Sequence, residues 1–245
     1  MPETTSNSLD VLGIRPVADA VSHVSKATVD GASSFLSRIC LPAAEEFGLL
    51  LQDKVRAWRA ENAIRVVAKA QAKLEKYATA QDSHAHPRLI ANVIEEGSWV
   101  DDATLQEMWG GLLASSCSPD GQDDSNLIFI GLLKRLTRLQ VKLLCYSVEQ
   151  SKKGVDANGL IAVTDRLMVD IPTVLAIAHV DDVHRVDQEL DHLRGSELIL
   201  EGFNSASTQA NLEPTALALN LYVRCQGYRG SAVEFFGLAQ NSVKP

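Results

Sequence analysis

Histidine and cysteine are the side chains in this sequence that could bind a transition metal. His84 and His86 flank Ala85 in a polar stretch, and a His-x-His pair can supply two ligands to zinc. A complete site needs more ligands, and no cysteine or further histidine lies nearby. The four cysteines are widely separated and form no Cys-x-x-Cys pair: Cys40, Cys117, Cys145 and Cys225. We therefore predict no metal site and expect reduced, buried thiols.

Acidic side chains gather in the turn-forming stretch 118–126, at Asp120, Asp123 and Asp124. Calcium loops also combine aspartate with glycine, but the EF-hand spacing and its closing glutamate are missing. The sequence also lacks Gly-x-Ser-x-Gly, P-loop and His-Glu-x-x-His motifs, and it has no nuclease-type cluster of Asp, Glu and Lys. We expect a surface turn here, and a protein that is not an enzyme, needs no cofactor and has no identifiable small-molecule substrate.

Basic side chains are concentrated between residues 53 and 76, where seven Lys and Arg residues meet three acids, a local net charge of +4. The candidate interaction surface on this stretch consists of Lys54, Arg56, Arg59, Arg65, Lys69 and Lys73. Such a stripe could contact an anionic partner or a membrane surface. The interpretation we favour is a solvated helix face that balances acidic neighbours.

The composition predicts a soluble globular protein. Of 245 residues, 46% are hydrophobic and 22% are charged, and 31 acidic against 23 basic residues give a net charge of −8. Nucleic-acid binders need clustered Lys and Arg, so this balance argues against broad nucleic-acid binding. Residues 1–10 are polar and are expected to be frayed. Because neither a signal peptide nor an apolar run of about 20 residues is visible, we expect a cytoplasmic location.

Helical periodicity dominates residues 11–134, the first predicted domain. Gly31 predicts a break in the first helix. Pro42 then suits the first turn of a long helix that reaches about Ala80. Further helices are expected from Pro87 to about Gly97, and after the cap candidates Asp101 and Asp102.

Large aromatic and small residues within these helices predict the packing of the first domain. Trp58 and Trp109 lie on the apolar faces of their helices and are expected in the core. Gly110 and Gly111 each weaken a helix interior by about 1 kcal/mol relative to alanine. The pair would be tolerated where another helix packs closely.

Residues 135–228 predict a second domain, followed by a C-terminal tail at 229–245. The expected elements are a helix at 138–150, a loop at 151–159, a short strand and a helix capped by Thr173 within 160–180, a helix at 181–194, a β-hairpin at about 198–213 and a helix capped by Thr215. This order resembles a winged helix domain. We therefore predict a mainly α protein, with a helical N-terminal domain followed by a winged-helix-like unit with one small β-hairpin.

The helix at 181–194 would be the DNA-reading helix of a winged helix domain. It carries five acidic residues against Arg185 and Arg194, a net charge of −3, which would repel a phosphate backbone. We expect no specific nucleic-acid binding and a domain that serves packing or protein contacts. His184 and His192 are eight positions apart, too far for one metal site.

Three helical stretches carry a wider resemblance. Their motifs are Pro-Ala-x-Glu-x-x-Gly-x-x-x-x-Asp, Arg-x-x-Asn and Leu-x-x-Met-Trp-x-x-Leu-Leu-Ala-Ser. The matching residues are Pro42, Ala43, Glu45, Gly48, Asp53, Arg59, Asn62, Leu105, Met108, Trp109, Leu112, Leu113, Ala114 and Ser115. Over roughly 31–228 the chain resembles the abortive-infection alpha family of bacterial proteins. The resemblance implies a helix-rich protein linked to phage defence and supplies no catalytic residue.

The first hypothesis for function is therefore a non-enzymatic protein of an abortive-infection system that acts through a protein partner or self-association. The alternatives are a winged-helix DNA-binding transcription regulator and a membrane-surface effector. The acidic helix at 181–194 counts against the regulator. The acids Asp53, Glu61 and Glu75 dilute the basic stripe that a membrane-surface effector would use.

Overall fold

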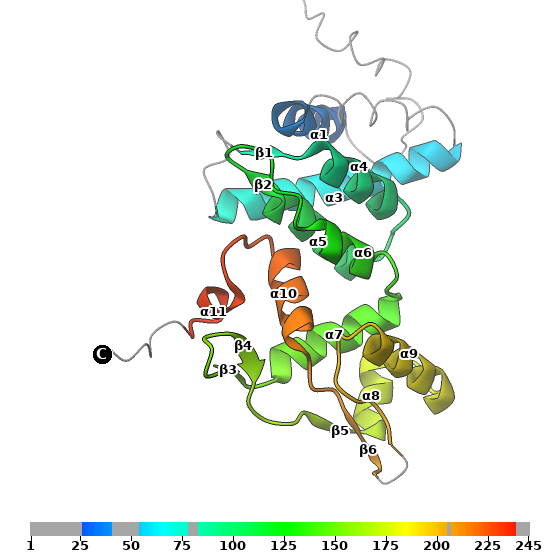
Figure 1. Cartoon of the computed structure of the whole chain (residues 1–245). Helices are drawn as coiled ribbons and strands as arrows, with labels where there is room; N and C mark the ends of the chain where they lie inside the picture. Colours follow the sequence, from blue (N-terminus) through cyan, green and yellow to red (C-terminus); the bar gives the residue numbers. More distant parts are fainter. Residues whose placement is uncertain (1–25, 41–53, 78–82, 205–206, 239–245) are drawn as a thin grey trace, which may run out of the picture. The chain divides into compact units, whose positions relative to one another are not determined.

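The computed structural model describes residues 26–40, 54–77, 83–204 and 207–238. Helices dominate this part of the chain, and its strands pair only in small two-stranded antiparallel sheets (Figure 1). The mainly α class is therefore confirmed. The chain divides into two compact units, residues 1–130 and 131–245. The expected frayed segment at 1–10 and the helix start at Pro42 lie outside the described residues.

Helix α3 (Lys54–Tyr77) is the central element of the first unit, and α1 (Lys26–Ile39), α4 (Pro87–Ser98) and α5 (Ala103–Ser115) all pack against it (Figure 1). The predicted break at Gly31 is wrong, because α1 runs through it. An added Cβ at Gly31 would meet no heavy atom within 4 Å. The cost of about 1 kcal/mol for a glycine in a helix is offset by burial of Phe35 and Leu36.

Helices α3 and α5 approach each other closely at Gly110. A Cβ at this position would lie 2.7 Å from Lys69 Cβ, 3.0 Å from the Val66 carbonyl oxygen and 3.1 Å from the Ala70 nitrogen. The prediction that a helix packs closely against the glycine pair is confirmed at Gly110. Trp109, the neighbouring residue, is 1% exposed, so its predicted place in the core is confirmed too.

Local capping explains where the helices of the first unit begin. His86 Nδ1 accepts a hydrogen bond from the Arg88 N–H just before α4, and Asp102 Oδ1 accepts from the Thr104 and Leu105 N–H groups at the start of α5. The predicted starts of α4 and α5 are confirmed. Of the two cap candidates, Asp102 caps the helix.

The first unit also contains a short two-stranded sheet that was not predicted. Strand β1 (His84–Ala85) pairs antiparallel with β2 (Cys117–Ser118), which leads into the expected turn at 118–126. Gly121 has φ +64° there, a conformation that favours glycine. Helix α6 (Leu127–Leu133) follows the turn.

The second unit is built on α7 (Arg138–Gln150), which packs against α8 (Ile171–Ala178), α9 (Val183–Gly195) and α10 (Ala216–Cys225). The predicted helices at 138–150 and after Thr215 are confirmed. The predicted cap of α8 is wrong. Asp170 caps this helix, because its carboxylate accepts a hydrogen bond from the Thr173 N–H at 2.9 Å. Hydrogen bonding from the Thr173 side chain, together with this N–H bond, lowers the pKa of Asp170 below its usual value.

This unit contains a hairpin in addition to the one that the sequence predicted. Strand β3 (Lys153–Val155) pairs with β4 (Ile161–Val163), where a loop was predicted over 151–159. Asp156 forms the turn between them, since its carboxylate accepts from the N–H groups of Asn158 and Leu160 at 2.8 and 2.9 Å. Gly159 has φ +80°, which completes a hairpin whose Asp-Ala-Asn-Gly signal is visible in the sequence.

The expected hairpin at 198–213 forms only isolated bridges between its own arms, Ile199 with Pro214 and Gly202 with Asn211. Its second arm contains β6 (Gln209–Asn211), which pairs antiparallel with β5 (Met168–Asp170) on the other side. The winged helix itself stays a prediction. Within the expected tail, α11 (Ala232–Phe235) is followed by Phe236, whose ring stacks on Tyr222 with centroids 6.5 Å apart.

Candidate functional site

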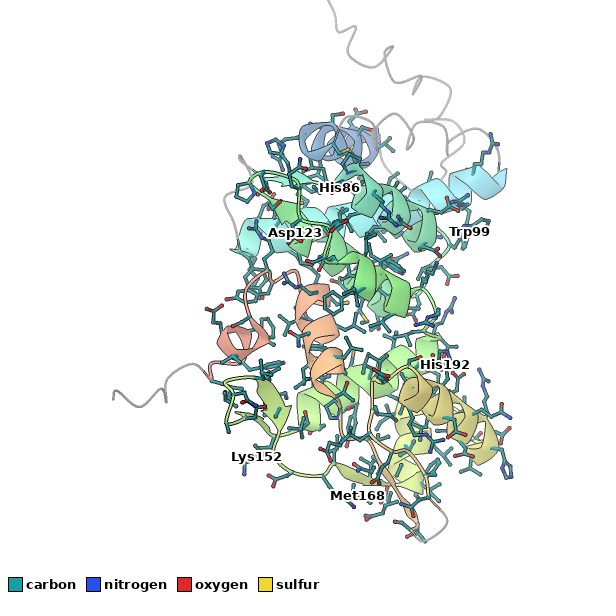
Figure 2. All side chains as sticks on the ribbon, in the orientation of Figure 1. His86, Trp99, Asp123, Lys152, Met168 and His192 are labelled. Carbon is teal, nitrogen blue, oxygen red and sulfur yellow. The ribbon has the colours of Figure 1, made fainter. Side chains whose placement is uncertain are left out.

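Two exposed tryptophans form the most distinctive surface of the first unit. Trp58 on α3 is 39% exposed and Trp99 at the end of α4 is 52% exposed, with ring centroids 6.4 Å apart. Figure 2 labels Trp99. The predicted burial of Trp58 is therefore wrong. The buried face of α3 includes four alanines, Ala57, Ala60, Ala63 and Ala70, together with larger side chains such as Ile64 and Leu74. Trp58 lies beside this face.

Arg59 and Glu95 both contact the Trp99 side chain and fix its position. The Arg59 guanidinium lies over that ring, 4.2 Å from its centroid, and donates to Glu95 Oε2 at 2.6 Å. Its Nε donates to Ser98 Oγ at 3.0 Å, and the Trp99 indole N–H donates to Glu95 Oε1 at 3.1 Å. We call this cluster of Trp58, Arg59, Glu95 and Trp99 the Trp surface.

The charge of Glu95 is stabilised within this cluster. Partial burial alone would raise the pKa of Glu95, but the hydrogen bonds from Arg59 and Trp99 and the positive charge of Arg59 lower it below the usual value. The carboxylate therefore stays ionised at neutral pH and keeps both partners in place. The Arg59 side chain is only 12% exposed, so it acts here as a support for the indole ring.

Most of the predicted basic surface on α3 is paired within the first unit. Arg59, Arg65, Lys69 and Lys73 each form an ion pair with a glutamate: Arg65 with Glu61 at 3.5 Å, Lys73 with Glu107 at 3.4 Å, and Lys69 also with Glu107. Arg56 is exposed, and the side chain of Lys54 lies outside the described residues. This pairing agrees with a helix face that balances acidic neighbours, and partner binding by these residues stays a prediction.

A groove lined by polar residues lies between α7 and α9 in the second unit. His192, one of its lining residues, is labelled in Figure 2. It has a volume of about 520 Å³. It is lined by Arg135, Thr137, Gln140, Arg185, Gln188, Glu189 and His192. We call it the α7–α9 groove. No local sequence pattern indicates this groove, because residues about 50 positions apart meet there.

Gln140 is the buried hub of this groove. Its Oε1 accepts from the Thr137 N–H at 3.0 Å, and its Nε2 donates to the Glu189 carbonyl oxygen at 3.3 Å and to His192 Nδ1 at 2.9 Å. The Thr137 hydroxyl in turn accepts from the Gln140 N–H and donates to Glu189 Oε2 at 2.8 Å. These bonds fix the first turn of α7 against α9.

Comparison with known protein families identifies the chain. The family model described as abortive infection alpha matches residues 59–218, about two thirds of the sequence. The chain belongs to the abortive infection alpha family. The match begins at Arg59 of the Trp surface and includes every residue that lines the α7–α9 groove. Neither the curated proteins nor the solved structures contain a match to the chain.

The described residues of this abortive infection alpha protein contain no group of three or more His, Cys, Asp and Glu side chains that could hold a metal ion. His84 lies in β1, and His86 is engaged as the cap of α4. Asp120 and Asp123 accept hydrogen bonds from nearby backbone N–H groups in the turn at 118–126. No helix in the same described ranges is long and apolar enough to cross a membrane.

None of the four cysteines of this family member forms a disulfide within the described residues. Cys40, Cys117 and Cys225 are buried, as predicted, whereas Cys145 on α7 is half-buried. Burial, with a contribution from the nearby Glu149 carboxylate, raises the pKa of Cys145 to about 12. Since the thiolate is the reactive form, this thiol is almost entirely unreactive at neutral pH.

We therefore expect Cys145 to resist iodoacetamide at pH 8 in the folded protein and to react readily in urea. Mass spectrometry of the Cys145 peptide measures both states. The same peptide in urea supplies the control, because unfolding restores an ordinary thiol pKa. Alkylation of folded Cys145 at the rate of a free thiol would contradict the burial described here.

Proposed function

We propose that this protein is a non-enzymatic component of a bacterial phage-defence system and acts in the cytoplasm through protein contacts. Membership of the abortive infection alpha family supports the link to phage defence. The observation that carries the mode of action is the Trp surface, where two large aromatic side chains are exposed at one place. Tryptophan is highly buried on average in folded proteins, so an exposed pair marks a binding surface.

The composition and geometry of the Trp surface suit a protein partner. Tryptophan and arginine are enriched among the residues that contribute most to protein–protein binding. Arg59 and Glu95 already fix the Trp99 ring, so little side-chain freedom is lost when a partner binds. Glu95, which is 59% exposed, adds negative charge beside the rings and disfavours an anionic membrane as the target. The partner is a second copy of this chain or another protein of the same defence system.

The second unit supports this function as a winged helix that packs against protein. Strand β6 pairs with β5, and its last residue Asn211 also forms an isolated bridge with Gly202, an arrangement that supports the winged-helix proposal. Residues 181–194 carry a net charge of −3, a sign that opposes the approach of duplex DNA.

A phage challenge tests the proposal. Replacing Trp58 and Trp99 together with serine should abolish protection, so that phage plate as efficiently as on cells that lack the gene. Both side chains are exposed, so the double variant should fold and accumulate normally. The measurement is plating efficiency on a phage against which the native protein protects.

The matched control is Leu160→Ser, which removes an equally apolar side chain that is 63% exposed at the tip of the β3–β4 hairpin. This variant should protect like the native protein. Full protection by the Trp58→Ser, Trp99→Ser protein at native abundance would reject the Trp surface as the site of action.

A further inference from the structure

The α7–α9 groove presents hydrogen-bond donors that the protein itself does not use. Arg185 is exposed, and within the described residues its guanidinium has no hydrogen bond or ion pair. Glu189, one turn further along α9, accepts from the Thr137 hydroxyl through Oε2 at 2.8 Å and forms no ion pair with Arg185 within the described residues. In the same described part of the chain, Arg135 donates through its Nε to the Gly131 carbonyl oxygen at 3.1 Å, which leaves its two terminal nitrogens available to a ligand.

The hub residue Gln140 makes His192 a further donor. The Gln140 amide oxygen accepts from the Thr137 N–H, so the Gln140 nitrogen must be the atom that faces His192 Nδ1. Nδ1 is then the acceptor of this hydrogen bond and carries no proton. The neutral ring therefore holds its proton on Nε2, which is free to donate to a ligand in the groove.

The charges on α9 are divided between two faces. Arg185, Gln188 and His192 recur at intervals of three and four and line the groove. Asp187 and Asp191 do not line it, and Asp191 pairs with Arg194 at 2.7 Å. The groove therefore carries two arginines against the single carboxylate of Glu189, although the helix as a whole is acidic.

We propose that the α7–α9 groove binds the phosphoryl group of a small phosphorylated molecule. Three features support this ligand class. Two guanidinium groups match the geometry and charge of a phosphate, and the His192 Nε2–H and Gln188 amide add donors for its oxygens. The volume of about 520 Å³ lies in the range of small-molecule sites. The acidic remainder of α9 repels a long polyanion, so a compact ligand is favoured over a nucleic acid.

Isothermal titration calorimetry of the purified full chain in phosphate-free buffer at low salt tests the proposal. The probes are inorganic phosphate, adenosine monophosphate and glucose 6-phosphate, with adenosine and glucose as their phosphate-free counterparts. We expect binding of the phosphorylated probes and none of adenosine or glucose. Arg135→Ala and Arg185→Ala should each weaken binding about tenfold or more, as for loss of a charge-assisted hydrogen bond.

Arg194→Ala is the matched control, because Arg194 lies on the same helix but outside the groove, paired with Asp191. It should bind the probes like the native chain. Arg185→Lys keeps the charge without the planar fork and should give intermediate affinity. Melting temperatures equal to the native value would show that each variant is folded.

Three results would overturn the proposal. One is the absence of binding by every phosphorylated probe at millimolar concentration. Another is an equal loss of affinity in Arg194→Ala and Arg185→Ala, which would indicate a general charge effect. The third is a DNA duplex that displaces the small probes and depends on Arg185, which would assign the groove to nucleic acid. None of these results bears on the Trp surface, so the two proposals fail separately.

Discussion

Replacing Trp109 with alanine is expected to lower the free energy of unfolding by about 3–5 kcal/mol, the usual cost of truncating a buried tryptophan. The side chain is 1% exposed within α5 and is the largest of the fully buried side chains. Its removal leaves a cavity next to Gly97, whose place for a Cβ lies 3.5 Å from Trp109 Cβ and Cγ. Urea denaturation followed by circular dichroism measures the change.

Trp58→Ala is the matched control for this prediction, since it removes the same group from a position that is 39% exposed. It should cost clearly less, because part of its surface is already in water and no enclosed cavity is left. Equal losses for the two variants would mean that Trp58 is covered in solution, and that result would also weaken the Trp surface as an open site.

Gly110→Ala is expected to lower the free energy of unfolding by about 1–3 kcal/mol, the range for overpacking a tight contact. Alanine is the better helix former by about 1 kcal/mol, so helix propensity alone predicts the opposite sign. We expect the steric contact to outweigh helix propensity, because the new Cβ would lie within 3.1 Å of the α3 backbone at Val66 and Ala70. Backbone atoms cannot rotate away as the end of a side chain can.

Gly131→Ala in α6 is the control, because a Cβ there meets no heavy atom within 4 Å. It should raise the free energy of unfolding by up to about 1 kcal/mol through helix propensity. The same glycine-to-alanine change is therefore expected to lower the free energy of unfolding at position 110 and to raise it at position 131. A stabilised Gly110→Ala protein would refute the close approach of α3 and α5.

Most helix starts could be predicted from the sequence because a cap is a local interaction. Asp102, Thr137 and Thr215 each accept from N–H groups two or three residues further on, and Pro87 occupies the first turn of α4, so the signal and the structure occupy the same short stretch. The family could be predicted as well, from the Arg-x-x-Asn motif at Arg59 and the Trp109 motif. The predicted loop at 151–159 was wrong although the Asp156 turn was visible, because strands of three residues are too short to show alternation.

Both candidate sites depend on contacts that no local pattern contains. Arg59 and Glu95 are 36 positions apart, and Gln140 and His192 are 52 positions apart. Trp58 fits an apolar stripe when large residues alone are counted, but tertiary packing buries the neighbouring Ala57 and Ala60 and leaves Trp58 39% exposed. Burial of Trp58 was therefore a reasonable expectation from the sequence and still wrong.

The hydrogen bonds of Gln140 also limit how this sequence can evolve. Glutamate at position 140 would set an acceptor against His192 Nδ1 and the Glu189 carbonyl oxygen, and asparagine would be one methylene too short to span the same three partners. A single substitution at position 140 leaves the Glu189 carbonyl oxygen or His192 Nδ1 without its hydrogen-bond donor. Replacement of Gln140 therefore requires a compensating change at position 192. Positions 140 and 192 should therefore covary among homologues, whereas exposed Arg194 on the same helix should vary independently.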